Sequence, residues 1–340
     1  MKSKFTIHDL AADLAISPGT VSKVLNGKGH VTDATRHRIL DRAKEVGYVA
    51  SHSARILKAK HSWTIGVVFS DIALFGLEHP FFGSIIQAFK NTIEEHGYEM
   101  VFIPKKLGQQ QQTYLQWARN KNVDGVLILT GDKNDKDILE LIHSDILCVS
   151  TDIVMDGLTT IVSDDQQGIH LMLDHLLAQR HRDIAAMSGS LFSRAYQQRA
   201  DAFRTILDSK GLVWDDTRLC VSEAYGYDAY YATAKQWIQT WTTRPTAILA
   251  FSDDIAMALI HALRDEGLDV PHDIIVSGYD DIHFARLFSP SITTIRQNKH
   301  GIAKLAAEKL LMMIQGTYVD PMCYKVSVEL IERQSTKRFE

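Results

Sequence analysis

Pairs of adjacent aspartates stand at three places where an apolar run ends: Asp164-Asp165, Asp253-Asp254 and Asp280-Asp281. Such a carboxylate can cap the following helix by accepting a hydrogen bond from a backbone N–H. It can also line a ligand site, because ligands of open α/β sheets bind at the carboxyl ends of strands. Charged hydrogen bonds are strong, so carboxylates together with an arginine such as Arg199 suit the hydroxyl groups of a neutral ligand. Both uses remain open for each pair.

Carboxylates that are far apart in the sequence could also meet as the acid and base of a glycoside hydrolase. Nothing in the sequence gives either one the environment that raises a catalytic pKa, so we predict a binding protein and not an enzyme. No Cys/His spacing of a zinc site and no glycine-rich phosphate loop is present. We therefore expect no metal and no cofactor.

The cysteines Cys148, Cys220 and Cys323 are isolated within apolar runs. They are expected to be buried free thiols of a protein in a reducing compartment. The first residues lack the apolar core of a signal peptide, and no run approaches the length of a membrane span. The sequence thus predicts a cytoplasmic protein and argues against an exported binding protein.

Apolar runs and helical stripes alternate along residues 63–333. The runs lie at 64–69, 100–103, 125–129 and 146–149, and again at 184–187, 219–221, 247–251 and 274–279. Continuous apolar strands between helices predict parallel sheets that are covered on both faces. About 270 residues exceed one comfortable core, so we expect two α/β lobes.

The start of the chain has a different pattern. Residues 6–26 predict two short amphipathic helices joined by a tight turn, with Ser17 as N-cap and Pro18 as the first helical residue. Thr32 should cap a third helix, which ends with Gly47 in the C′ position. The apolar positions of the first two helices are Ile7, Leu10, Ala11, Leu14, Val21, Val24 and Leu25. This is a helix-turn-helix, which presents one helix to the DNA major groove; a plain helical hairpin packed on the body is the alternative.

Charge divides the chain in the same place. Residues 1–61 carry a net charge of +6 and the remainder −10. That asymmetry is expected when one end of a protein meets phosphate. The predicted domains are a helix-turn-helix domain at 1–49, a polar, basic linker at 50–62 and an effector-binding and dimerisation domain at 63–333.

Taken together, the motifs resemble those of the LacI/GalR family of bacterial repressors over essentially the whole chain. The residues that carry the resemblance are 6–9, 20–27, 35–36, 47–48, 54–57, 65–68, 124–126, 180–181, 252–254, 278–281 and 293–297. The resemblance implies a periplasmic-binding-protein-like effector domain and a DNA-binding repressor controlled by a small molecule, most often a sugar. It also implies a homodimer on a pseudo-palindromic operator. A sugar-binding protein or glycoside-processing enzyme without a DNA role is the alternative.

The resemblance also assigns residues that contact DNA: Ser17, Pro18, Gly19, Thr20, Ser22, Lys23, Asn26, His30 and Leu57. Pro18, Gly19 and Lys23 match base-reading positions, but only Lys23 has a side chain that can hydrogen-bond a base, preferably guanine. Leu57 matches the wedge that enters the minor groove. We therefore expect operator shape to carry an unusual share of the specificity.

For the effector, the resemblance assigns contacts to Asp152, Arg199, Asp253 and Asp280, with Ser70, Phe81, Phe82, Ser193 and Ala195 lining the same cleft. Asp253 replaces an asparagine of some relatives. Val221 stands where relatives often have an aromatic platform, although Tyr225 is nearby.

The resemblance further implies that the chain passes three times between the lobes, near Ile161, Thr293 and Met322. This gives a first lobe at 63–161 and 293–320 and a second lobe at 162–292 and 321–333.

Overall fold

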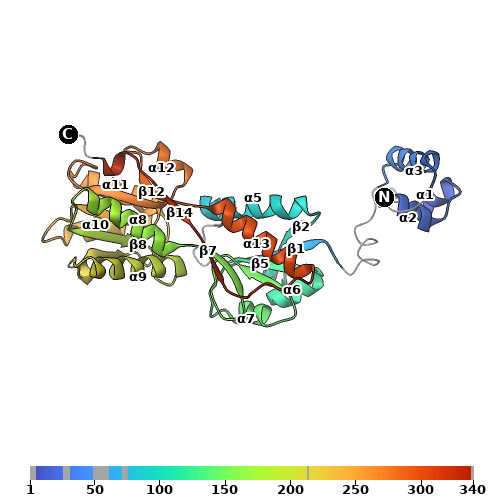
Figure 1. Ribbon diagram of the computed structural model, residues 1–340, viewed down its shortest axis with the longest axis horizontal. Helices are drawn as coiled ribbons and strands as arrows, with labels where there is room; N and C mark the ends of the chain where they lie inside the picture. Colours follow the sequence, from blue (N-terminus) through green and yellow to red (C-terminus); the bar gives the residue numbers. More distant parts are fainter. Residues whose placement is uncertain (1–4, 26–30, 49–60, 71–75, 213, 338–340) are drawn as a thin grey trace. The chain divides into compact units, whose positions relative to one another are not determined.

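The computed structural model describes residues 5–25, 31–48, 61–70, 76–212 and 214–337 (Figure 1). The chain divides into two compact units, Met1–Trp63 and Thr64–Glu340.

The first unit contains three helices, α1 (Ile7–Asp13), α2 (Pro18–Leu25) and α3 (Asp33–Glu45). Thr6 and Asp9 form a capping box on α1, and Thr32 caps α3. The predicted cap of α2 is confirmed, since Ser17 Oγ accepts a hydrogen bond of 3.2 Å from the backbone N–H of Thr20. The three helices share a small core of buried side chains: Leu10, Ala11, Leu14, Val21, Val24, Ile39 and Ala43.

The second unit contains two six-stranded sheets. The first has the order β13-β7-β6-β5-β1-β2 and the second β14-β12-β11-β10-β8-β9. The strands of the first are β1 (Thr64–Phe69), β2 (Glu99–Phe102), β5 (Gly125–Thr130), β6 (Cys148–Ser150), β7 (Thr159–Ser163) and β13 (Cys323–Val326). Those of the second are β8 (Ile184–Ser188), β9 (Leu219–Val221), β10 (Ala247–Ala250), β11 (Ile275–Asp280), β12 (Thr293–Gln297) and β14 (Val328–Ile331).

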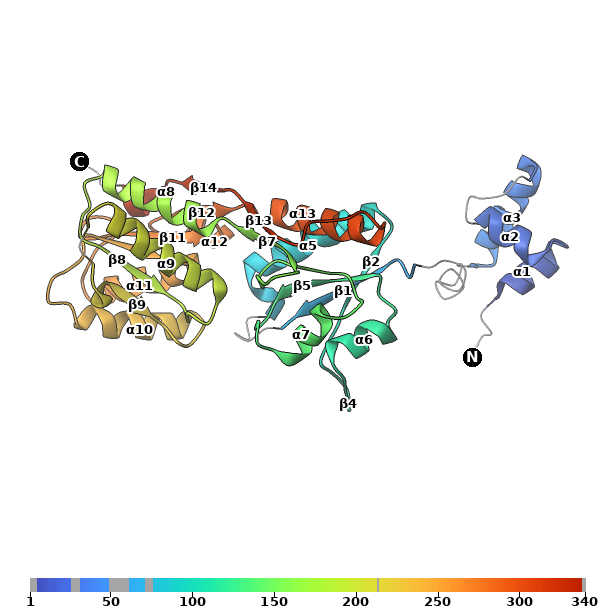
Figure 2. The ribbon, with the colours of Figure 1, turned by 60° about the horizontal axis from the view of Figure 1, so that its bottom comes forward.

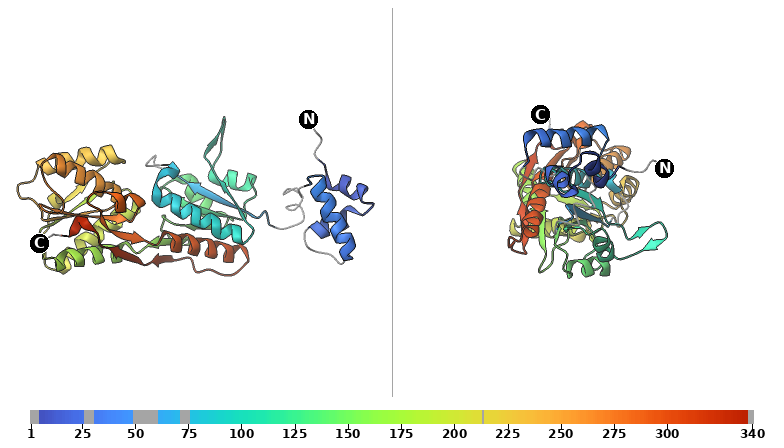
Figure 3. Two further views of the ribbon diagram at one scale, coloured as in Figure 1. Left: turned by 90° about the horizontal axis from the view of Figure 1, so that it is seen from above. Right: turned by 90° about the vertical axis from the view of Figure 1, so that its right-hand side faces the viewer.

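Neighbouring strands in both sheets are parallel except for β12 and β14, which are antiparallel. The predicted α/β class with two lobes is therefore confirmed. A short hairpin of β3 (Lys106–Leu107) and β4 (Gln110–Gln111) projects from the first lobe (Figures 2 and 3).

Helices cover both faces of each sheet, as continuous apolar strands require. In the first lobe, α5 (Pro80–Glu95) packs with α13 (Lys299–Ile314), and α6 (Tyr114–Asn120) packs with α7 (Lys136–Ile142). In the second lobe, α8 (Asp165–Ala178) and α9 (Arg194–Ser209) share one core. The helices α10 (Tyr227–Gln239), α11 (Asp253–Asp265) and α12 (His283–Leu287) share the other. Single turns of 3-10 helix lie at η1 (Gly76–Glu78), η2 (Asp216–Arg218) and η3 (Gln334–Thr336).

The passages between the lobes differ from the expected ones. Strand β12 (Thr293–Gln297) pairs with β11 in the second sheet, although the family resemblance implies that it belongs to the first lobe. Strand β13 (Cys323–Val326) pairs with β7 in the first sheet, although it was placed in the second lobe. The chain thus changes lobe after Ser163, after Gln297 and at Ser327. An apolar strand has the same local pattern in either sheet, so only tertiary pairing decides which lobe it joins.

Among the residues that the structure describes, no helix combines the length and apolar character that crossing a bilayer requires.

Candidate functional site

Helix α2 presents its polar side away from the small core of the first unit. Gly19 and Lys23 are exposed, whereas Val21 and Val24 are buried. Ser17 and Thr20 are joined by a hydrogen bond of 2.9 Å between their hydroxyl groups, so both stand at the exposed start of the helix. Pro18 and Ser22 are half-buried. The predicted contacts of Asn26, His30 and Leu57 lie outside the described residues.

In the second unit, Arg199 on α9 is the centre of a buried charge cluster. Its Nε donates to Asp165 Oδ1 at 2.9 Å, and another guanidinium nitrogen donates to the Phe251 carbonyl at 2.6 Å. The same nitrogen lies 3.8 Å from Asp280 Oδ1, and the guanidinium lies 3.7 Å from the ring centre of Tyr279. Burial alone would lower the pKa of Arg199, but Asp165, Tyr279 and Asp280 raise it. The arginine therefore stays charged in a low-dielectric site.

Asp280 ends strand β11 beside this arginine. Gln297 Nε2 donates to Asp280 Oδ1 at 2.5 Å, which ties the end of β12 to the cluster. Burial raises the pKa of Asp280, while Arg199 and Lys299 act to lower it. Asp280 therefore links the cluster to the point where the chain leaves the second lobe.

Asp253 is fully buried at the start of α11. One carboxylate oxygen accepts from the backbone N–H of Ile282 at 2.8 Å, and the other from the Thr294 hydroxyl at 2.6 Å. Burial, and then Asp280, raise its pKa well above the ordinary value. In this arrangement Asp253 supports the strand ends, since both oxygens are already used inside the lobe.

The next residue, Asp254, faces the first lobe. Its carboxylate lies 3.9 Å from Nε2 of His79, the residue before α5, and its side chain is 31% exposed. Burial raises the pKa of Asp254, and His79 opposes the increase. Of the pair singled out in the sequence, Asp254 is therefore the residue that reaches across the lobes.

The first lobe contributes residues at the ends of β1, β5 and β6. Asp152 accepts from the Thr130 hydroxyl at 2.7 Å and from the backbone N–H of Gly131 at 3.4 Å. The backbone N–H of Ser70 donates to the Thr130 carbonyl at 3.1 Å. The carboxyl ends of these parallel strands thus bring Asp152 and Ser70 to one edge, as ligand sites of such sheets require.

Phe81 and Phe82 begin helix α5 and belong to an aromatic group. The ring centre of Phe82 lies 5.4 Å from that of Phe81, 5.6 Å from Phe69 and 5.2 Å from His79. Both phenylalanines are half-buried. They give the strand ends of the first lobe an apolar flank.

Arg194, at the start of α9, connects the two lobes and was not singled out in the sequence. Its Nε lies 3.6 Å from Asp152 Oδ1, and it donates a hydrogen bond of 3.2 Å to Asp165. Its neighbours Ser193 and Ala195 are half-buried, and Ser193 does not cap α9 with its hydroxyl. The sequence signal that could have indicated Arg194 is its position between Ser193 and Ala195, two residues assigned to the cleft.

Val221 ends strand β9 and is half-buried. Burial raises the pKa of Tyr225, which hydrogen-bonds to Ser190 and lies near Asp152 and Glu223. Val221 thus leaves the platform position without an aromatic side chain, but Tyr225 supplies one near Asp152 and Ser190.

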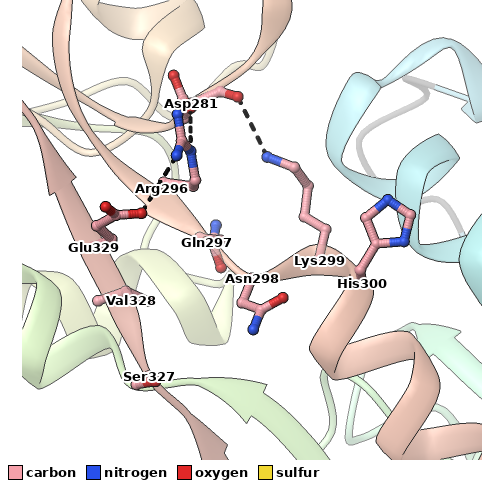
Figure 4. Close-up of a pocket in the computed structure, with 9 residues that line it drawn as sticks. All are labelled: Asp281, Arg296, Gln297, Asn298, Lys299, His300, Ser327, Val328 and Glu329. Atoms are coloured by element: carbon pink, nitrogen blue, oxygen red, sulfur yellow. Dashed lines mark hydrogen bonds and ion pairs between the residues drawn. The ribbon is translucent and has the colours of Figure 1, made fainter.

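A pocket of about 490 Å³ lies where the chain passes between the lobes (Figure 4). Lys299 donates to the Asp280 and Asp281 carbonyls, and Arg296 pairs with Asp281 at 2.6 Å and with Glu329 at 3.3 Å. The pocket is lined by Asp281, Arg296, Gln297, Asn298, Lys299, His300, Ser327, Val328 and Glu329. Arg296 is thus paired with two carboxylates, and Lys299 is held by backbone carbonyls. Within the described ranges, no group of three or more His, Cys, Asp or Glu side chains is placed to hold a metal ion.

A helix-turn-helix unit followed by two α/β lobes with a charged site between them is the architecture of an effector-controlled regulatory protein. Comparison with known proteins agrees. Residues 6–51 match the model of bacterial regulatory proteins of the lacI family, and residues 173–336 match a periplasmic binding protein-like domain.

The chain is 33% identical over 335 residues to the HTH-type transcriptional repressor PurR of Erwinia tasmaniensis, covering 97% of this chain and 96% of that protein. It is 29% identical over 338 residues to PurR of Vibrio vulnificus, covering 98% and 99%. Among solved structures, the lac repressor dimer bound to operator and the anti-inducer ONPF has a TM-score of 0.84 at 24% identity, covering 97% and 98%. The complex of the transcriptional regulator CelR with cellobiose has a TM-score of 0.72 at 25% identity, covering 97% and 99%.

The chain belongs to the LacI family of bacterial regulatory proteins. It is a DNA-binding transcription regulator with a small-molecule effector domain.

Proposed function

We propose that this protein is a cytoplasmic, homodimeric repressor whose operator affinity is set by a neutral polyhydroxylated molecule, a sugar, held between the two lobes. The observation that supports this best is the set of polar pairs that join the lobes around Arg199. Arg194 lies 3.6 Å from Asp152, and His79 lies 3.9 Å from Asp254. A molecule that changes these pairs also changes how the lobes are held.

On the DNA side, Lys23 is the base reader and Ser17, Thr20, Ser22 and Asn26 contact phosphate. One helix-turn-helix covers only a few base pairs, so two copies are needed for a palindromic site. Pro18 and Gly19 have no side chain that can hydrogen-bond a base. Much of the specificity therefore comes from operator shape and from the central base step of the operator, which Leu57 opens.

On the effector side, the charged residues at the strand ends carry no excess of positive charge. The carboxylates of Asp165 and Asp280 are matched by Arg199, which leaves no net positive charge to attract an anion. The solved relative CelR binds cellobiose. Both observations favour a neutral sugar, and neither favours the alternative of a glycoside-processing enzyme.

The two halves are coupled through the lobes. A ligand fixes the angle between them, and the linker at 50–62 then orders on the operator or fails to. A coupling of roughly 1–3 kcal/mol, which is about 5–150-fold in affinity, is typical of such regulators.

The test has two parts. A palindrome selected from random duplex is titrated with the purified full-length protein at physiological ionic strength, with a scrambled duplex as control. Sugars that raise the melting temperature of the protein are then added to the complex. We expect the protein to bind the palindrome in preference to the scrambled duplex. One of these sugars should change its affinity for the palindrome at least fivefold. Equal binding of both duplexes would overturn the proposal that the protein is a repressor. A response only to anions would overturn the proposal that the effector is a sugar.

A further inference from the structure

We propose that Arg194 determines the specificity of the ligand site, because Arg194 and Asp152 together hold one hydroxyl group of the sugar between the lobes. The inference rests on the proposed function and adds a residue to it. Arg194 comes from the second lobe, at the start of α9, and Asp152 from the first, after β6.

The pair is incomplete as it stands. The Nε–H of Arg194 is buried and donates no hydrogen bond to any described residue. Asp152 Oδ1 lies 3.6 Å from this nitrogen, which is longer than a hydrogen bond. A buried donor without an acceptor costs free energy. A ligand group that accepts this hydrogen bond therefore removes that cost and binds more tightly.

A hydroxyl group completes both partners. An oxygen at about 2.8 Å from each atom fits beside a pair that is 3.6 Å apart. It accepts from Arg194 Nε–H and donates its own proton to Asp152 Oδ1. The remaining groups of both residues stay in place, since Thr130 holds Asp152 Oδ2 at 2.7 Å and Asp165 holds Arg194 at 3.2 Å.

The surroundings disfavour a charged ligand group at this place. Asp165 lies against both Arg194 and Arg199, and together with Asp152 and Asp280 it offsets the charge of the two arginines. Glu223 binds Ser190 at 3.0 Å on the same lobe. A carboxylate or phosphate would meet these acids as well as the arginine, whereas a hydroxyl group avoids that repulsion.

The experiment combines ligand and protein changes. Full-length wild-type protein is titrated by calorimetry with cellobiose, glucose, galactose and ribose, and then with each monodeoxy analogue of the best binder. The variants are Arg194→Gln, Asp152→Asn and both together, and Arg182→Gln is the matched control because Arg182 is exposed on the same lobe. Circular dichroism and operator binding verify that each variant is folded.

We expect Arg194→Gln to weaken the best sugar at least tenfold and Arg182→Gln to leave it unchanged. One deoxy analogue should bind the wild-type protein at least tenfold more weakly than the parent sugar does. The Arg194→Gln variant should bind this analogue and the parent sugar with equal affinity. The double variant should lose less than the product of the single losses, because both residues serve one hydroxyl group.

Three results would overturn the assignment: an unchanged affinity in Arg194→Gln, independent losses in the double variant, or no deoxy analogue that cancels the variant's effect. A tenfold preference for glucose 6-phosphate or glucuronate that disappears in Arg194→Gln would replace the hydroxyl group with an anion. If no sugar binds the wild-type protein, the proposal that the effector is a sugar is wrong, and so is the role proposed for Arg194.

Discussion

Arg199 donates through Nε to Asp165 at 2.9 Å, with the two side chains 5% and 4% exposed. This pair joins α9 to the start of α8 inside the second lobe. Because it is deeply buried, the residue assigned to the effector is also part of what holds the lobe together.

We therefore expect Arg199→Ala to destabilise the protein by about 3 kcal/mol, the lower end of the range for a broken buried ion pair, because Arg194 still pairs with Asp165 and Gln297 still donates to Asp280. Urea unfolding measures the loss, and Arg182→Ala, at an exposed position, should stay within about 0.5 kcal/mol of wild type. A folded Arg199→Ala protein of wild-type stability would show that the pair contributes little.

The ligand response of Arg199→Ala is a separate matter. At a temperature where the variant is folded, it should bind operator DNA but lose its response to the effector. Loss of operator binding in the folded variant would assign Arg199 a structural role only.

Asp253 should make stability depend on pH. Its folded pKa is raised well above the ordinary value by burial and by Asp280. The folded state thus keeps this proton at pH values where the unfolded chain, with a pKa near about 3.9, has lost it. The stability contribution of the neutral acid is complete below that value and is lost as pH rises through the folded pKa.

Asp253→Asn removes this dependence, because an amide keeps an oxygen for Ile282 N–H and a donor for Thr294. We expect the variant to equal wild type below about pH 4 and to gain on it as pH rises to neutrality, by about 1.4 kcal/mol for each unit of raised pKa that this pH range spans. Unfolding curves from pH 4 to 8 measure the difference. Asp156→Asn, at an exposed position of the same unit, is the control, and parallel curves for Asp253→Asn and wild type would contradict the prediction.

Lys23 should supply base discrimination. Lys23→Ala should weaken binding of the selected palindrome by about 1–3 kcal/mol and relax the preference at one base position of each half-site. Fluorescence anisotropy with single-base variants of the palindrome measures both effects. Lys44→Ala, an exposed lysine on α3, is the control. An equal loss on all sequences would show that Lys23 contacts phosphate.

Leu57 should act only on specific DNA. Leu57→Ser should weaken binding of the palindrome while leaving non-specific, salt-dependent binding nearly intact. Titrations of both duplexes at several salt concentrations separate the two. Equal losses on the two duplexes would rule out the wedge.

Local structure could be predicted from the sequence because it depends on nearby residues. The cap formed by Ser17, the capped start of α3 at Thr32 and the strand at 64–69 all follow from short-range patterns, and the structure confirms them. The lobe to which a strand belongs depends on distant partners. For that reason, β12 and β13 were placed in the wrong lobes.

The candidate site shows the same division. Asp253 and Asp254 are adjacent and chemically identical, yet one is fully buried and the other is 31% exposed opposite His79. The helix phase at the start of α11 decides between them. For Arg194 the sequence offers only its place between two assigned cleft residues, because its role depends on Asp152 of the other lobe.

Ser327 is the single residue between β13 of the first sheet and β14 of the second. With so short a joint, one lobe cannot slide past the other without breaking strand pairing. Motion is restricted to rotation about a few backbone bonds at the three passages. We therefore expect the size of a bound molecule to set the angle between the lobes.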